Sequence, residues 1–141
     1  MSIDIQAILD FMHRYDLCVL SVTNTQGNSE SALVGFSENS ACELLIGTTT
    51  SSRKYANIAA NPNVSVVIGW NEGIYMQYEG TARVLQKGEE LEARLRNHFV
   101  KVPDAEKYRD NPEQCYIIVE PKWLRYTDIN PSPRFIKEIT F

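Results

Sequence analysis

The residues best suited to binding a ligand lie in one short stretch of this sequence. Five consecutive hydroxyl residues, 48–52, are followed at once by Arg53 and Lys54. Ser51 or Ser52 can cap a helix that begins at these cations, because a serine oxygen accepts from free N–H groups of a first helical turn. Arg and Lys are unfavourable at this position, because their positive charges are repelled by the partial positive charge of a helix N-terminus. A bound anion, most naturally a phosphate monoester, would offset that conflict.

The same residues have an interpretation without a ligand. A capped helix can carry long basic side chains that simply extend into water. Apolar runs at 44–46 and 64–68 flank the stretch, and Asn61-Pro62 ends the predicted helix. The order is therefore strand, polar loop, helix and strand. This stretch alone favours neither interpretation, a phosphate site or a solvated helix start.

The remaining elements follow from hydrophobic periodicity and turn residues. An N-terminal helix is predicted over 2–15, with Ser2 as its cap, and a second amphipathic helix over 88–100, with Leu91, Leu95 and Phe99 on its apolar face. The segment 104–112 is a short link. Further strands are predicted at 17–23, 29–37, 42–46, 74–86, 114–120, 123–127 and 134–141.

These elements amount to about seven strands and three helices, mostly joined by short turns. Gly80 inside a long strand predicts a bulge or a close backbone approach, either of which helps the sheet to curl, and Pro121 is expected to interrupt a late strand. The pattern predicts a single domain, 1–141, of the α+β class: mainly β, a closed antiparallel barrel with flanking helices. The helix after residue 52 is expected to cover one end of the barrel.

Composition excludes several functional classes. The net charge is −4 and the pI about 5.2, which argues against a nucleic-acid-binding protein. No stretch approaches the ~18 apolar residues of a membrane span, and the N-terminus does not resemble a secretory signal. Cys18, Cys42 and Cys115 are expected to be free thiols, two of them buried. A cytoplasmic location is the simplest prediction.

The common catalytic motifs are absent. The sequence has neither G-x-G-x-x-G nor G-x-x-x-x-G-K-[ST], and no G-x-S-x-G elbow. His13 and His98 lie on predicted helices, far from any cysteine pair, so no metal site is expected. His98 is expected on a helix surface. A chain with so few acids, bases and nucleophiles would take its chemistry from a cofactor.

One set of motifs resembles a known family. The set comprises Gly47-Thr48 with the hydroxyl run, Arg53-Lys54, Asn57-Ile58 and the run 61–65, NPNVS. Together they resemble the signature of the pyridoxamine 5'-phosphate oxidase-like FMN-binding split barrels. The order of elements, with Tyr78-Glu79-Gly80-Thr81-Ala82 on the next strand, agrees over nearly the whole chain.

The resemblance implies a split β-barrel homodimer with FMN in a cleft between subunits. Thr48, Ser52, Arg53 and Lys54 would hold the FMN phosphate. Leu33, Val34, Gly35 and Phe36 would offer backbone groups to the polar edge of the isoalloxazine. Tyr75 takes the place of a flavin-contacting glutamine, and Tyr126 and Arg134 match a late aromatic residue and arginine that reach the cofactor.

Two departures indicate the general-stress-like branch rather than the oxidase itself. Cations that the oxidases carry on the second strand are replaced here by Ala32 and Ser37, and their pyridoxal-phosphate-binding Tyr/Arg/Ser set has no match in 88–103. The main prediction is a flavin-dependent oxidoreductase acting on an unidentified small molecule. The alternatives are a non-catalytic flavin carrier, a deazaflavin- or haem-binding module of the same fold, and a cofactor-free interaction dimer.

Overall fold

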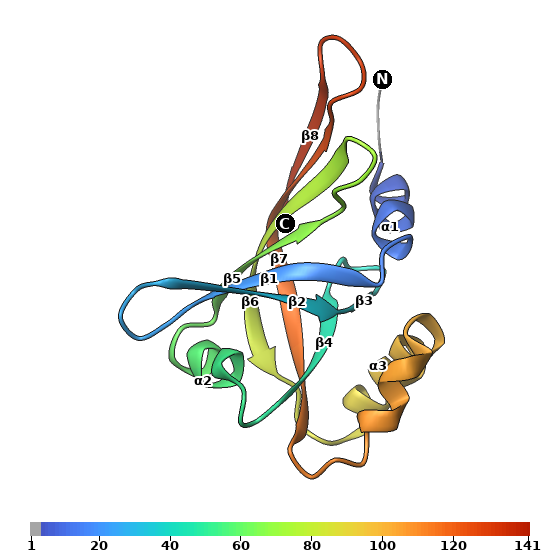
Figure 1. Ribbon diagram of the computed structural model, residues 1–141. Helices are drawn as coiled ribbons and strands as arrows, with labels where there is room; N and C mark the ends of the chain where they lie inside the picture. Colours follow the sequence, from blue (N-terminus) through green and yellow to red (C-terminus); the bar gives the residue numbers. More distant parts are fainter. Residues whose placement is uncertain (1–3) are drawn as a thin grey trace.

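The computed structural model describes residues 4–141 (Figure 1). Within these residues, eight strands form one sheet, and three α-helices and a short 3-10 helix connect or cover them. In chain order the elements are α1 (Ile5–His13), β1 (Leu17–Thr23), β2 (Ser29–Gly35), β3 (Ser37–Glu38), β4 (Leu44–Thr49), α2 (Arg53–Ala60), β5 (Asn63–Ile68), β6 (Ile74–Val84), α3 (Glu89–Lys101), η1 (Pro103–Tyr108), β7 (Gln114–Asp128) and β8 (Phe135–Thr140).

The strands form an antiparallel barrel, as predicted. The pairing order is β2-β1-β5-β6-β7-β4-β3, and every pair is antiparallel. The first and last strands in this order, β2 and β3, are separated in the chain only by Phe36, so the sheet curls round until its two ends meet. β8 lies off this path and pairs with β7, forming an arm beyond the barrel (Figure 1).

The β6–β7 pair carries the predicted bulge. The ladder shifts register between Glu79 and Gly80, and Pro121 lies opposite Gly80. A Cβ on Gly80 would lie 2.5 Å from the carbonyl oxygen of Glu120, so only glycine permits this approach. The expectation that Pro121 interrupts the strand was wrong. β7 continues through it, because a residue at a bulge need not supply a ladder N–H.

Some predicted boundaries also moved. β4 extends to Thr49 because its ladder with β7 includes Thr48 and Thr49, so the hydroxyl run begins on a strand. The Ser2 cap lies outside the described residues. Asp4 caps α1 instead, where its carboxylate accepts from the N–H of Ala7 at 2.9 Å.

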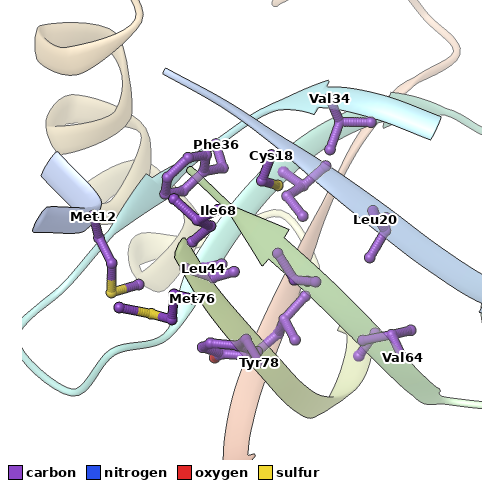
Figure 2. Close-up of a cluster of buried hydrophobic side chains, with 14 of the residues drawn as sticks. Met12, Cys18, Leu20, Val34, Phe36, Leu44, Val64, Ile68, Met76 and Tyr78 are labelled. Carbon is purple, nitrogen blue, oxygen red and sulfur yellow. The ribbon is translucent and has the colours of Figure 1, made fainter. Parts of the chain in front are cut away.

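The main core fills the barrel (Figure 2). Met12 and Phe36 pack there with Ile68 and Met76, and all four are fully buried or nearly so. Tyr78 is among the largest fully buried side chains of residues 4–141, and its hydroxyl donates to the carbonyl oxygen of Cys42 at 2.7 Å. This bond fixes the start of β4 to the middle of β6.

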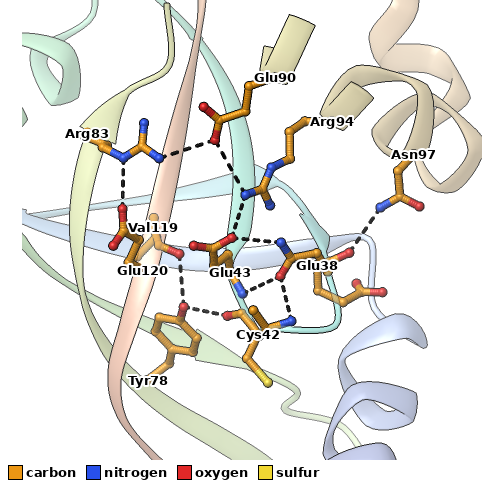
Figure 3. A network of polar contacts seen from close by, with 12 residues as sticks. Glu38, Cys42, Glu43, Tyr78, Arg83, Glu90, Arg94, Asn97, Val119 and Glu120 are labelled. Carbon is orange, nitrogen blue, oxygen red and sulfur yellow. Dashed lines mark hydrogen bonds and ion pairs between the residues drawn. The ribbon is translucent and has the colours of Figure 1, made fainter. Parts of the chain in front are cut away.

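α3 packs on the outside of the barrel through a second core. Leu91 and Leu95 are buried against Leu45 and Ile118, which confirms the predicted apolar face. A polar network borders this contact (Figure 3), in which Arg94 donates to Glu43 at 2.6 Å. Burial alone would raise the pKa of Glu43, but hydrogen bonds from Arg94 and Asn39 outweigh it and lower that pKa. The network therefore fixes α3 to the turn between β3 and β4.

Candidate functional site

The start of α2 has the capped geometry expected for an anion site. Ser52 is the N-cap, and its hydroxyl oxygen accepts from the N–H of Tyr55 at 3.2 Å. Thr48 donates to the same oxygen at 2.9 Å, and the ammonium of Lys54 lies 3.5 Å from the Thr48 hydroxyl. We call Thr48, Ser52 and Lys54 the hydroxyl–lysine group. Within residues 4–141, no carboxylate forms a salt bridge with Lys54.

Arg53 points to a different environment. Its side chain is 79% exposed, and its Nε lies 3.4 Å from a carboxylate oxygen of Glu30 on β2. Asn57 donates to the same oxygen at 2.9 Å, and Asn24 donates to the other at 3.1 Å. A carboxylate of the protein therefore offsets part of the positive charge at this helix start, and sequence reasoning did not find it.

A cavity of about 420 Å³ opens beside the hydroxyl–lysine group. Its wall includes backbone from Gly35 on β2 and Gly47 on β4, and side chains from α3, η1 and β7. A Cβ on Gly47 would come within 2.9 Å of the amide of Gln114 and 3.4 Å of the Tyr116 ring. Glycine at this position lets both side chains lie over β4. The polar side chains in the wall are Thr48, Thr49, Ser52, Lys54, His98, Asp104, Lys107, Tyr108, Gln114 and Tyr116.

His98 belongs to this cavity wall, and the expectation that it lies on a helix surface was wrong. It is only 2% exposed, because it shares the inward face of α3 with Leu91 and Leu95. Its Nδ1 lies 2.7 Å from the hydroxyl of Ser37, which is also buried. Burial, assisted by the nearby charge of Lys101, lowers the pKa of His98 to about 4. The imidazole is therefore neutral at pH 7.

Tyr116 forms the neighbouring part of the wall. Its ring centroid lies 6.5 Å from that of His98 in an edge-on arrangement. The side chain is 5% exposed, and its hydroxyl has no hydrogen-bond partner within residues 4–141. Burial raises the pKa of this hydroxyl, so it stays protonated. We call His98 and Tyr116 the aromatic pair. The sequence did not identify either residue as part of a site.

The β2 residues implied by the resemblance divide into two kinds. Leu33 is 60% exposed and Gly35 lines the cavity, whereas Val34 and Phe36 are buried in the core. The N–H of Phe36 already donates to the carbonyl oxygen of Asp16 at 3.0 Å. Because β2 pairs with only β1, the backbone groups on its other edge remain outside the ladder.

Tyr75, Tyr126 and Arg134 lie elsewhere in the chain. Tyr75 is opposite Thr127 in the β6–β7 ladder, and the ring of Tyr126 packs 5.4 Å from that of Phe11. Arg134 is exposed just before β8. Six residues, roughly 20 Å of strand, separate Tyr75 from the part of β6 that faces the end of α2. The β7–β8 arm at this end of the sheet leads away from α2 (Figure 1). One copy of the chain therefore keeps these three residues apart from the hydroxyl–lysine group.

An antiparallel sheet curled into a barrel, whose end strands β2 and β3 are joined through Phe36 without pairing, together with a polar cavity beside a capped helix, defines the split-barrel class of folds. The chain belongs to the pyridoxamine 5'-phosphate oxidase family, whose profile matches residues 5–128. This confirms the family and fold that the sequence motifs predicted. No curated protein matches the chain in sequence.

Solved structures share this fold. A heme binding protein from Mycobacterium smegmatis superimposes with a TM-score of 0.83 at 16% identity, over 99% of this chain and 59% of that one. General Stress Protein 26 from Bacillus anthracis gives 0.74 at 21% identity, over 96% and 98%. An FMN binding, pyridoxamine 5'-phosphate oxidase-related protein from Nostoc punctiforme gives 0.69 at 11% identity, over 96% and 94%. Such identities establish the fold alone.

Two further findings bear on the site. Within residues 4–141, no group of three or more His, Cys, Asp or Glu side chains could hold a metal ion. No helix in that part of the chain is long and apolar enough to cross a membrane.

Proposed function

We propose that this protein binds FMN, with the phosphate held by the hydroxyl–lysine group. The observation that carries the proposal is the half-buried Lys54, which forms no salt bridge with a carboxylate of residues 4–141 and contacts Thr48 at the N-terminus of α2. Free N–H groups of the first helical turn, two hydroxyls and an ammonium make a favourable phosphate environment. Arg53 adds less than the motif suggests, because Glu30 already pairs with it.

The rest of the site fits a flavin in chemical character. The unpaired edge of β2 at 33–35 offers backbone donors and acceptors to a heterocyclic ring, and the cavity volume is within the range of ligand pockets. FMN when bound supplies the capacity to accept and donate a hydride. The chain's own residues would bind and orient it, and we assign no side chain a role as catalytic acid or base.

The proposal requires a homodimer. Tyr75, Tyr126 and Arg134 can meet the hydroxyl–lysine group only if a second copy supplies them, because the β6–β7–β8 arm of one chain leads away from α2 (Figure 1). An apolar stripe on the outer face of the sheet supports such an assembly. Leu33 and Val67 both lie opposite Val19 across β2, β1 and β5, and both are exposed in one chain.

An FMN titration followed by absorption tests the cofactor. We expect flavin bands in the purified protein or a saturable complex on adding FMN, and Lys54→Met should weaken FMN binding at least about tenfold while leaving riboflavin binding nearly unchanged. Lys107→Met is the matched control, because Lys107 lines the same cavity from η1 without contacting the hydroxyls. Equal losses for FMN and riboflavin would reject the phosphate assignment.

Light scattering tests the dimer. Leu33→Asp should produce a monomer with weakened FMN binding, whereas Val100→Asp, at an exposed position on α3, should leave both properties intact. A wild-type monomer that binds FMN at full affinity would contradict the shared cleft.

Anaerobic bleaching of the complex by NADH or NADPH separates an oxidoreductase acting on a small molecule from a passive flavin carrier.

Haem is the second candidate, favoured by the likeness to the Mycobacterium smegmatis protein and by a histidine in the cavity wall. His98 would have to turn outward to bind iron, since its ring is 2% exposed and Ser37 holds one of its nitrogens. A Soret band on adding haemin, lost in His98→Ala, would support this candidate. A flavin spectrum or a deazaflavin spectrum identifies the other ligands directly.

A further inference from the structure

The aromatic pair is chemically unlike the hydroxyl–lysine group in the same cavity. The hydroxyl of Tyr116 has no partner within residues 4–141, although the side chain is 95% buried. Buried hydroxyls are nearly always hydrogen-bonded. The Gln114 side chain lies near enough to act on this hydroxyl but does not reach hydrogen-bonding geometry with it. A partner from outside the described chain therefore fits this atom, and Tyr116 lines the cavity from which one can reach it once the side chain shifts.

His98 lines the same cavity and carries a second polar atom without a partner, which a ligand meets when the buried ring turns outward. Ser37 engages only Nδ1, and Nε2 forms no hydrogen bond to any of residues 4–141. Ser37 does not line the cavity, so it acts as a positioning residue that fixes the ring and its tautomer. If the Ser37 hydroxyl donates to Nδ1, Nε2 carries the ring N–H. If Nδ1 donates to Ser37, Nε2 has a free lone pair.

The aromatic pair carries no net charge. Tyr116 stays protonated and His98 stays neutral, as the directions of their pKa shifts require. Lys101, the charge closest to His98, is already paired with Glu38 and lies over the ring of Phe36. Arg109, whose charge acts on the Tyr116 hydroxyl, is likewise paired with Glu92. An ionic group placed beside the aromatic pair would therefore be desolvated without a free counter-ion from either of these cations.

We propose that His98 and Tyr116 form a subsite for a small uncharged ligand that carries a carbonyl or amide group. The ligand's carbonyl oxygen accepts from the Tyr116 hydroxyl. An amide can also donate to Nε2 of His98 or accept from it, so it fits either tautomer of the ring. This subsite goes beyond the proposed FMN phosphate site and does not depend on it, because it uses different side chains of the cavity wall.

Three probes of similar shape and different charge test the proposal: benzamide, benzoate and benzylamine. Calorimetric titration of the full chain should give saturable benzamide binding, with benzoate and benzylamine at least about tenfold weaker. Tyr116→Phe removes only the hydroxyl and should weaken benzamide binding about fivefold or more. The same variant should keep or raise the melting temperature, because it removes an unsatisfied buried group.

Thr127→Val is the matched control. Thr127 carries the other buried hydroxyl without a partner on β7, and it does not line this cavity. This variant should likewise keep or raise the melting temperature while leaving benzamide affinity unchanged. Lys54→Met should lose FMN phosphate binding and retain benzamide binding, so failure of one site is distinguishable from failure of the other.

The proposal is overturned by any of three results. The first is no benzamide binding at millimolar concentration, and the second is equal affinity for benzamide and benzoate. The third is a Tyr116→Phe variant that binds benzamide as tightly as the wild type, or that melts several degrees lower, which would make the hydroxyl a structural group.

Discussion

Ser37 and His98, sixty-one residues apart in the sequence, form a buried hydrogen bond of 2.7 Å between β3 and α3. The bond joins the short strand that completes the barrel to the helix that covers its outside. It also holds a neutral imidazole in the wall of the ligand cavity. Barrel closure and cavity chemistry therefore depend on the same contact.

The first prediction concerns stability in mild acid. The pKa of His98 is about 4 in the folded chain and near 6.5 in an unfolded one. Between these values the unfolded state binds more protons, so the free energy of unfolding falls as the pH is lowered from 6.5 toward 4. The loss from this residue should total roughly 3 kcal/mol.

Urea denaturation from pH 7 to pH 4 measures this loss. His98→Asn, which cannot take up a proton, should show a shallower decline than the wild type across that window, although it is less stable at pH 7. Parallel curves for the two proteins would contradict the assignment.

The second prediction concerns Glu30. Its carboxylate pairs with Arg53 and lies beside the helix start where we place the FMN phosphate. Glu30→Gln removes the negative charge and keeps an oxygen that can accept from Asn57, so FMN affinity should rise about fivefold, corresponding to roughly 1 kcal/mol. The gain should shrink as salt is added.

Riboflavin provides the comparison, since it lacks the phosphate. Glu30→Gln should leave its affinity unchanged. An equal gain for both ligands would mean that Glu30 acts on the shape of the pocket rather than on its charge.

Much of this architecture was predictable from local sequence. Alternating strands, the Ser52 cap, the Asn61-Pro62 stop and the bulge glycine at 80 all act through residues close in the chain. Glu30 was not predictable, because only the folding of β2 beside α2 brings it to Arg53. His98 was readable in part: it lies three residues after Leu95 and seven after Leu91, on the buried face of α3. The unpartnered hydroxyl of Tyr116 depends on all its neighbours, so no sequence pattern reports it.

The third prediction tests the bulge. Gly80→Ala would place a Cβ 2.5 Å from the Glu120 carbonyl oxygen and 2.8 Å from Val119, and backbone cannot yield as a flexible side chain can. We expect a loss of about 3 kcal/mol in the free energy of unfolding. Gly27→Ala is the control: Gly27 has φ +81° but no neighbour within 4 Å of a Cβ, so only conformational strain of about 1 kcal/mol should appear. Similar losses in both variants, measured by chemical denaturation, would show that steric crowding at the bulge is not decisive.

The fourth prediction connects cysteine reactivity to the phosphate site. Cys18 and Cys42 are buried and Cys115 is half-buried, and burial raises the pKa of all three thiols, that of Cys18 to about 12. Lys54 acts in the opposite direction on Cys115, which lies beside Thr48 in the β4–β7 ladder. Ellman's reagent should therefore label one thiol in the native protein and three after unfolding, and Cys115→Ser should remove the native signal.

Lys54→Met, or a phosphate bound at Lys54, removes the cation's effect and should slow the labelling of Cys115 at a fixed pH. A native rate that is the same with and without FMN would place the ligand's charge away from Lys54.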